Sequence, residues 1–171
     1  RKAYNKENKN YIRCDDANIV RMYIRKLAES QPHIKVIVVD TINGLMVADE
    51  MRRSKEKGYD KWVDLAACVW DLVCECYDYR DDLTIVFTAH TQTDHDENGY
   101  MFTRIKTSGK KLDKIVLESK FTTVLLSKCV DGRYLFETQA RNSTAKSPMG
   151  AFDTFEIEND IVEVIKALEE F

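Results

Sequence analysis

KVIVVDT, from Lys35 to Thr41, is an unbroken run of β-branched residues that ends on a carboxylate. Because an apolar run without polar alternation needs cover on both faces, it predicts a buried central strand of a parallel α/β sheet. Asp40 is then expected at the carboxyl end of this strand, which is the edge where such sheets bind ligands.

Asp40 has two interpretations at this position. A carboxylate at the end of a central strand commonly holds Mg²⁺ through water beside a nucleotide phosphate, which is the Walker B role. Many α/β proteins instead end a strand on Asp to cap the helix that follows. The stretch from Lys35 to Thr41 leaves both interpretations open.

The composition predicts one globular domain with a sizeable core, since the chain has 171 residues of which 44% are hydrophobic. A net charge of −3 excludes a global attraction to nucleic acid, so any basic surface must be local. No apolar run is long enough for a membrane helix, and the polar opening does not resemble a signal peptide, which predicts a cytoplasmic location. Five cysteines without a CxxC pair predict reduced thiols.

A second strand is predicted at Leu83–His90, an apolar run that again ends on a polar residue. Two parallel strands of this design would bring Asp40 and His90 to the same edge of the sheet. Helices are expected from a cap at Asp15 or Asp16 to about Ser30 and from Asp60 to Tyr79. A short strand at Tyr11–Cys14 would complete a right-handed β-α-β unit.

The second half of the chain is predicted to contain a β-hairpin and a final helix. Thr91 to Gly99 is polar and acidic, which favours a loop, and Leu112 to Ser119 favours a short helix. The hairpin is expected from Phe121–Val130 and Arg133–Gln139 around an Asp-Gly turn. The helix follows a cap near Asn159.

A phosphate-binding P-loop, GxxxxGK[ST], is absent from the 171 residues. The nearest segment is Thr107-Ser108-Gly109-Lys110-Lys111, which lacks the first glycine and has Lys111 where the motif needs Ser or Thr. The chain begins at Arg1 without a methionine, so we expect upstream residues to be missing.

Several segments, taken in order, resemble bacteriophage ATP-binding proteins of the AAA type with a RecA-like core, some of which assist single-strand annealing or recombination. The segments are Val36–Asp40, Leu83–His90, Thr107–Leu112, the hairpin, Thr144-Ala145-Lys146-Ser147-Pro148-Met149-Gly150 and Asn159-Asp160. The resemblance covers nearly the whole chain from Tyr11 onward. Members of the family carry a P-loop upstream of the stretch that matches Arg1.

The resemblance implies an α/β fold, a RecA-like P-loop NTPase core with a mainly parallel central sheet flanked by helices, followed by the C-terminal hairpin and helix. Residues 1–171 would form a single RecA-like ATPase domain whose P-loop strand and helix are missing. It also implies ATP and Mg²⁺ as cofactors and single-stranded DNA as partner. A homo-oligomeric ring or filament is expected, with a single-strand DNA-binding protein as a candidate partner.

Five residues receive site roles from the resemblance. Asp40 becomes the Walker B acid that holds Mg²⁺ through water, with Thr41 as its neighbour in the water shell. His90 becomes a sensor near the γ-phosphate, although a strand-end histidine bonded to backbone remains the alternative. Lys146, or Arg141 in its place, becomes a charge supplied across a subunit interface. A solvated loop lysine is the alternative for Lys146.

Two basic clusters are candidates for single-stranded DNA binding. Basic side chains attract the charged DNA backbone and aromatic side chains stack on bases, and both contacts contribute to the affinity for single strands. The first cluster includes Arg52 and Arg53. The second, with aromatic residues interleaved, includes Arg104, Lys106, Lys110 and Lys111. The alternative for both is a solvated charged face.

Other functions remain open besides an ATPase of phage recombination or replication. A non-enzymatic module without a P-loop would bind DNA or a partner subunit, and a helicase-like or packaging motor shares the same core strands. A metal site at His90, Asp94, His95 and Asp96 is possible by residue type, but a polar loop explains these residues more simply.

Overall fold

The computed structural model describes residues 3–58, 60–107 and 116–171. These residues divide into two compact units. The first contains residues 3–88, except Tyr59, together with Thr107, and the second contains residues 89–106 and 116–171. The expected single RecA-like domain over residues 1–171 stays a prediction.

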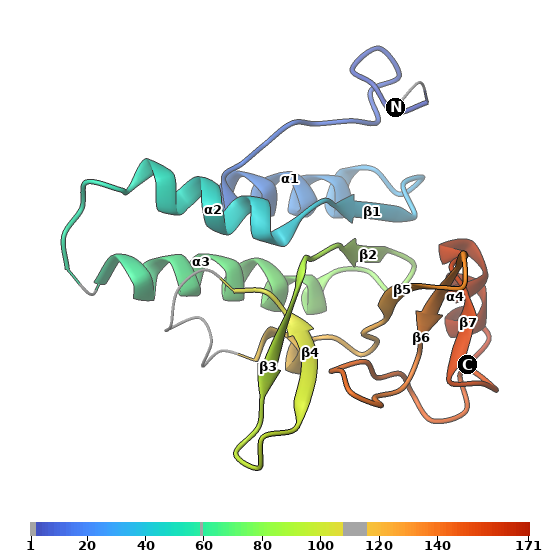
Figure 1. The fold of residues 1–171 in the computed structure, drawn as a ribbon. Coiled ribbons are helices and arrows are strands. Elements are labelled where there is room, and N and C mark those ends of the chain that lie inside the picture. The colour runs from blue at the N-terminus through green and yellow to red at the C-terminus, as the bar shows by residue number, and fades with distance from the viewer. Residues whose placement is uncertain (1–2, 59, 108–115) are drawn as a thin grey trace. The chain divides into compact units, whose positions relative to one another are not determined.

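Three helices belong to the first unit (Figure 1). They are α1 (Ala17–Ser30), α2 (Ile42–Arg52) and α3 (Asp60–Glu75), and α3 continues into the 3₁₀ turn η1 (Cys76–Asp78). Asp16 caps α1, because its side chain accepts hydrogen bonds from two backbone N–H groups of the first turn. The predicted first helix is therefore confirmed. The strand expected at Tyr11–Cys14 is wrong, since this segment pairs with no strand in the described residues.

A parallel pair of strands lies beside these helices in the first unit (Figure 1). It consists of β1 (Val36–Val39) and β2 (Thr84–Phe87), paired in register from Val36 opposite Thr84 to Val39 opposite Phe87. The fold is thus mixed α/β with small sheets, and the predicted parallel pairing of these two runs is confirmed. A mainly parallel central sheet is not shown, because the other sheets in the described part of the chain are antiparallel.

The core of the first unit covers one face of the β1–β2 pair. Val39 belongs to a buried cluster with residues of all three helices, and Ile37, Ile85 and Phe87 pack against it. Val36 and Val38 point the other way and are 43% and 59% exposed. The predicted cover on both faces of β1 is therefore wrong in this structure, because the helices pack on only one side of the pair.

A β-hairpin opens the second unit. It pairs β3 (Thr91–His95) with β4 (Met101–Ile105) in antiparallel register, and a turn at Gly99 (φ +83°) connects them. The predicted loop over Thr91–Gly99 is therefore wrong for Thr91–His95, where alternate residues are half-buried against β4, and right for Asp96–Gly99, which forms the turn. The short helix predicted from Leu112 appears as the 3₁₀ turn η3 (Leu117–Lys120), and residues 112–115 lie outside the described part.

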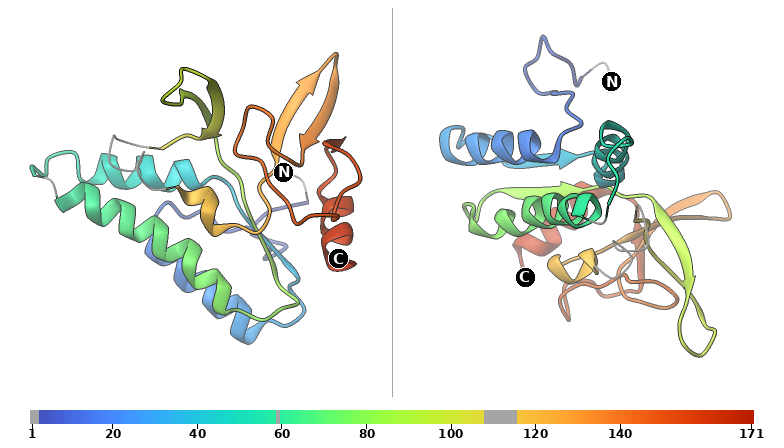
Figure 2. Two further views of the ribbon diagram at one scale, coloured as in Figure 1. Left: turned by 90° about the horizontal axis from the view of Figure 1, so that it is seen from below. Right: turned by 90° about the vertical axis from the view of Figure 1, so that its left-hand side faces the viewer.

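A three-stranded antiparallel sheet and one helix complete the second unit (Figure 2). The sheet contains β5 (Leu126–Val130), β6 (Arg133–Glu137) and β7 (Glu156–Glu158). The predicted hairpin is confirmed, and its Asp131-Gly132 turn has positive φ at both residues, as a two-residue turn of type I′ requires. The predicted final helix is α4 (Ile161–Glu169), capped by Asp160.

Candidate functional site

Asp40 lies directly after β1, and Thr88 lies directly after β2. Because the two strands are parallel and in register, both residues reach the same edge. Thr88 Oγ1 donates a hydrogen bond of 2.6 Å to Asp40 Oδ1, and the Ile42 N–H donates to the Thr88 carbonyl at 3.0 Å. Asp40 is solvent-exposed, so its second carboxylate oxygen is available for a water-mediated contact with a ligand.

Thr41 performs the capping role that was open for Asp40. Its Oγ1 accepts a hydrogen bond of 3.0 Å from the Gly44 N–H at the start of α2, and the Asp40–Thr41 peptide is cis. The charge of Asp40 is therefore not used to cap α2, and its ligand role stays a prediction.

His90 does not follow β2 as the sequence predicted, because β2 ends at Phe87. His90 belongs to the second unit, where it is exposed and its carbonyl accepts a hydrogen bond of 2.8 Å from the Lys106 N–H. Its sensor role stays a prediction. Sequence reasoning missed Thr88, although Thr88 is the first polar residue after an apolar run, just as Asp40 is.

Arg52, the last residue of α2, and Arg53, which caps its carboxyl end, contact carboxylates of the first unit. Arg52 lies 3.2 Å from Asp15 Oδ1 and 3.5 Å from Asp49 Oδ1. Arg53 lies 2.8 Å from Glu56 and 3.0 Å from Asp64, and these acids raise the pKa of its guanidinium. Their DNA-binding role is untested, and these ion pairs reduce the positive charge that either residue offers to phosphate.

The second basic cluster begins on a strand. Arg104 lies in β4, its side chain is only 13% exposed, and its guanidinium is 3.5 Å from Asp94 Oδ2 of β3. Lys106 follows β4 and is exposed. Lys110 and Lys111 lie outside the described residues. The DNA-binding role of this cluster stays a prediction.

Lys146 differs from these arginines. Its backbone pairs with Val124 through two hydrogen bonds of 2.7 and 2.8 Å, and its ammonium makes no ion pair with any carboxylate that the structure describes. Arg141, the substitute candidate, lies 3.5 Å from Glu156 and over the ring of Phe155. Lys146 thus combines a fixed backbone with a charge that pairs with no carboxylate of the described residues.

Two buried glutamates, which sequence reasoning missed, hold the loop that precedes Lys146. Glu137 of β6 is 4% exposed and accepts hydrogen bonds from Ser143 Oγ at 2.6 Å and from Lys128 Nζ at 2.8 Å. Burial alone would raise the pKa of Glu137, yet the hydrogen bonds from Lys128 and Ser143 hold its pKa below the usual range. Glu118, also buried, accepts from Thr144 Oγ1 at 3.2 Å.

No group of three or more His, Cys, Asp or Glu side chains able to hold a metal ion occurs in residues 3–58, 60–107 and 116–171. The water-mediated Mg²⁺ role of Asp40 needs no such group and stays a prediction. Within the same residues, every helix is too short or too polar to cross a bilayer. Comparison of the chain with protein-family models, with curated proteins and with solved structures finds no match.

Proposed function

We propose that this chain is part of the RecA-like core of a bacteriophage ATP-binding protein that acts on single-stranded DNA in recombination or replication. The observation that carries the proposal is the hydrogen-bonded pair of Asp40 and Thr88 at the carboxyl edge of two parallel strands. Parallel sheets bind ligands at that edge, and an acid there suits a magnesium ion bound to nucleotide phosphates.

Asp40 has one chemical task in this proposal. It holds the water shell of Mg²⁺ while ATP is bound, and Thr88 fixes the orientation of its carboxylate. Phosphoryl transfer depends mainly on positioning and on neutralising charge, so an oriented acid of this kind is what the reaction needs. The 171 residues lack GxxxxGK[ST], so the phosphate-holding loop must come from outside them.

Lys146 supplies the second part of the proposal. Its ammonium, which pairs with no carboxylate in the described part of the chain, lies on a backbone bonded to Val124 and suits a charge delivered to the nucleotide of a neighbouring copy in a ring or filament. Arg104, Lys106, Lys110 and Lys111 remain the proposed DNA-facing residues, with Arg52 and Arg53 as a second cluster. If the protein is phage-encoded, the host cytoplasm is its location.

A second candidate is a module that binds DNA or a partner without hydrolysing ATP. The observation in its favour is the missing phosphate-binding motif.

The test uses the protein expressed from the complete reading frame. Binding of a fluorescent ATP analogue is measured with and without Mg²⁺ for the wild type and for Asp40→Asn, which keeps the shape of the side chain and removes its charge. The matched control is Asp81→Asn, an exposed carboxylate near the opposite end of β2. We expect Asp40→Asn alone to lose the Mg²⁺-dependent part of the binding.

Two results would contradict the proposal. A wild-type protein that binds no nucleotide would favour the non-hydrolysing module. Nucleotide binding whose Mg²⁺ dependence is the same in Asp40→Asn and in the wild type would remove Asp40 from the site.

A further inference from the structure

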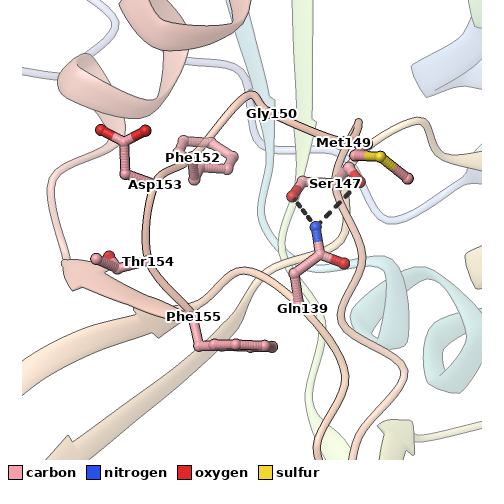
Figure 3. A pocket seen from close by; sticks show the side chains of 8 residues that line it. All are labelled: Gln139, Ser147, Met149, Gly150, Phe152, Asp153, Thr154 and Phe155. Atoms are coloured by element: carbon pink, nitrogen blue, oxygen red, sulfur yellow. Dashed lines mark hydrogen bonds between the residues drawn. The ribbon is translucent and has the colours of Figure 1, made fainter.

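A cavity of about 360 Å³ lies on the second unit, formed by the segment between β6 and β7 (Figure 3). Its volume falls within the range of small-molecule pockets, about 300–1,000 Å³. We call it the Phe155 pocket. It is lined by Gln139, Ser147, Met149, Gly150, Phe152, Asp153, Thr154 and Phe155.

Apolar side chains with accessible surface border this pocket. Phe155 is 52% exposed and Met149 is 93% exposed. Figure 3 shows Phe152 and Phe155 on different sides of the cavity, with the ring of Phe155 seen edge-on. Flat rings and a polarisable thioether favour contact with a planar aromatic ligand, and exposed apolar surface around a hollow commonly marks a binding site.

The hydroxyl groups of the pocket already donate their protons within the protein. Ser147 Oγ donates to the Thr138 carbonyl at 3.1 Å, and Thr154 Oγ1 donates to the Glu156 carbonyl at 2.7 Å. The pocket therefore offers no hydroxyl donor to a ligand unless one of these bonds is broken.

The acceptor groups of the pocket are available instead. Gln139 uses Nε2 to donate to the Ser147 carbonyl at 3.2 Å and to Ser147 Oγ at 2.7 Å, as Figure 3 shows, which leaves Oε1 as an acceptor. The Asp153 carboxylate has no hydrogen bond or ion pair with any residue that the structure describes. An amide oxygen and a carboxylate both match a ligand that carries N–H donors.

Positive charge lies next to these acceptors. The Arg141 guanidinium carbon is 5.1 Å from the centre of the Phe155 ring, and the Arg141 side chain is 58% exposed. A guanidinium at this position can contact a phosphate attached to a ligand that stacks on Phe155.

We propose that the Phe155 pocket receives one base of single-stranded DNA, and that it favours a base with an exocyclic amino group. The stacked base contacts Phe155, its amino group donates to Gln139 Oε1 or Asp153, and its phosphate lies near Arg141. This inference rests on the single-stranded DNA part of the proposed function and adds a base-contacting site outside the two basic clusters.

A cationic side chain of a partner protein is the competing occupant, since Asp153 and two aromatic rings also suit a guanidinium. Arg141 argues against it. Its own guanidinium already lies over the Phe155 ring, and its charge repels a second cation.

The experiment measures binding of the protein expressed from the complete reading frame to oligonucleotides of about 12 nucleotides by fluorescence anisotropy. Phe155→Leu keeps an apolar side chain and removes the stacking surface, whereas Phe155→Trp restores it. Tyr134→Leu is the matched control, because Tyr134 is an aromatic residue of β6 that is 67% exposed and does not line the pocket. Thermal unfolding of each variant verifies that it is folded.

We expect Phe155→Leu to weaken binding about fivefold or more, and we expect Phe155→Trp and Tyr134→Leu to bind like the wild type. Oligo-dC, whose bases carry an amino group, should bind more tightly than oligo-dT. Asp153→Asn should reduce the difference in affinity between oligo-dC and oligo-dT. An oligonucleotide that contains 2-aminopurine should change its fluorescence on binding the wild type and change it less with Phe155→Leu.

Each contrary result has its own meaning. If the wild type binds oligonucleotides and Phe155→Leu binds equally well, the pocket proposal fails and the DNA-binding function stands. If the wild type binds no oligonucleotide, both fail. If deoxycytidine monophosphate binds the pocket and strands do not, the ligand of the pocket is a free nucleotide and not single-stranded DNA. An arginine-containing peptide that displaces the strand from the wild type but not from Phe155→Leu would point to a protein partner.

Discussion

Thr88 Oγ1 donates a hydrogen bond of 2.6 Å to Asp40 Oδ1, which joins the ends of the two parallel strands. Thr88→Val removes the hydroxyl and keeps the shape of the side chain. Because a hydrogen bond to a charged group is lost, we expect the free energy of unfolding to fall by about 1–2 kcal/mol in urea titrations. Thr88→Ser retains the donor and should stay close to the wild type. Equal stability of Thr88→Val and Thr88→Ser would show that this bond contributes nothing.

Arg80 holds the carboxyl end of α1 and the start of β1. Its guanidinium donates to the carbonyl of Ala28 at 3.2 Å, to that of Gln31 at 3.4 Å and to that of Ile34, and it forms an ion pair with Asp82. Arg80→Met keeps the aliphatic part of the side chain and removes the guanidinium donors from these carbonyls, although the Gln31 carbonyl still accepts from the Ile34 N–H. We expect it to lower the free energy of unfolding by about 2 kcal/mol.

The control for Arg80 is Arg133→Met, an arginine of β6 whose ion pair with Glu158 is exposed. Exposed pairs contribute little, so this variant should unfold like the wild type. If both arginine variants lose the same stability, the carbonyl contacts of Arg80 are not the cause.

The lowered pKa of Glu137 predicts that the folded protein loses stability in acid. Its pKa in the folded protein lies below the ordinary value of 4.5, so the unfolded chain takes up the proton first as the pH falls. The contribution of Glu137 is therefore complete above about pH 4.5 and is lost as the pH falls through its lower folded pKa. Melting temperatures measured between pH 7 and pH 3 should decline less steeply for Glu137→Gln than for the wild type.

The matched control for this pH dependence is Glu158→Gln. Glu158 lies on the neighbouring strand β7 with a side chain that is 68% exposed. Glu158→Gln should therefore leave the decline of the melting temperature between pH 7 and pH 3 unchanged. A Glu137→Gln curve parallel to that of the wild type would mean that other carboxylates control the acid transition.

The sequence was a good guide wherever one segment determined its own structure. The Asp-Gly turn of the β5–β6 hairpin needs positive φ at both residues, and the cap at Asp16 satisfies the N–H groups of its own helix. The apolar runs that became β1 and β2 were recognised as parallel neighbours because each ends on a polar residue before a loop or helix. The turn and the cap depend on contacts within a few residues, whereas the pairing of β1 with β2 joins distant segments and was predicted from the similar pattern of the two runs.

Features that depend on distant partners could not be predicted in this way. Thr91–Gly99 looked like a loop, because only its pairing with β4 makes polar residues suitable for a strand. His90 was placed beside Asp40, whereas the strand ends earlier and Thr88 occupies that position. The sequence around Glu137 does not indicate that this carboxylate is buried, since its partners Lys128 and Ser143 come from other segments.

Lys146 provides the test of catalysis in the proposed ATPase. Its ammonium has no carboxylate partner in the described part of the chain, and Glu118 and Glu137 hold the loop before it through Thr144 and Ser143. If Lys146 reaches the nucleotide of a neighbouring copy, its charge matters in the transition state more than in binding. In the protein from the complete reading frame, Lys146→Ala should therefore abolish DNA-stimulated ATP hydrolysis and preserve nucleotide binding. Arg133→Ala, which removes an exposed guanidinium paired with Glu158, should retain turnover. Unchanged hydrolysis in Lys146→Ala would exclude this role. Mixing Lys146→Ala with Asp40→Asn, each expected to be inactive alone, would locate it, because only a charge supplied between subunits restores hydrolysis at a site whose own Asp40 and whose neighbour's Lys146 are both intact.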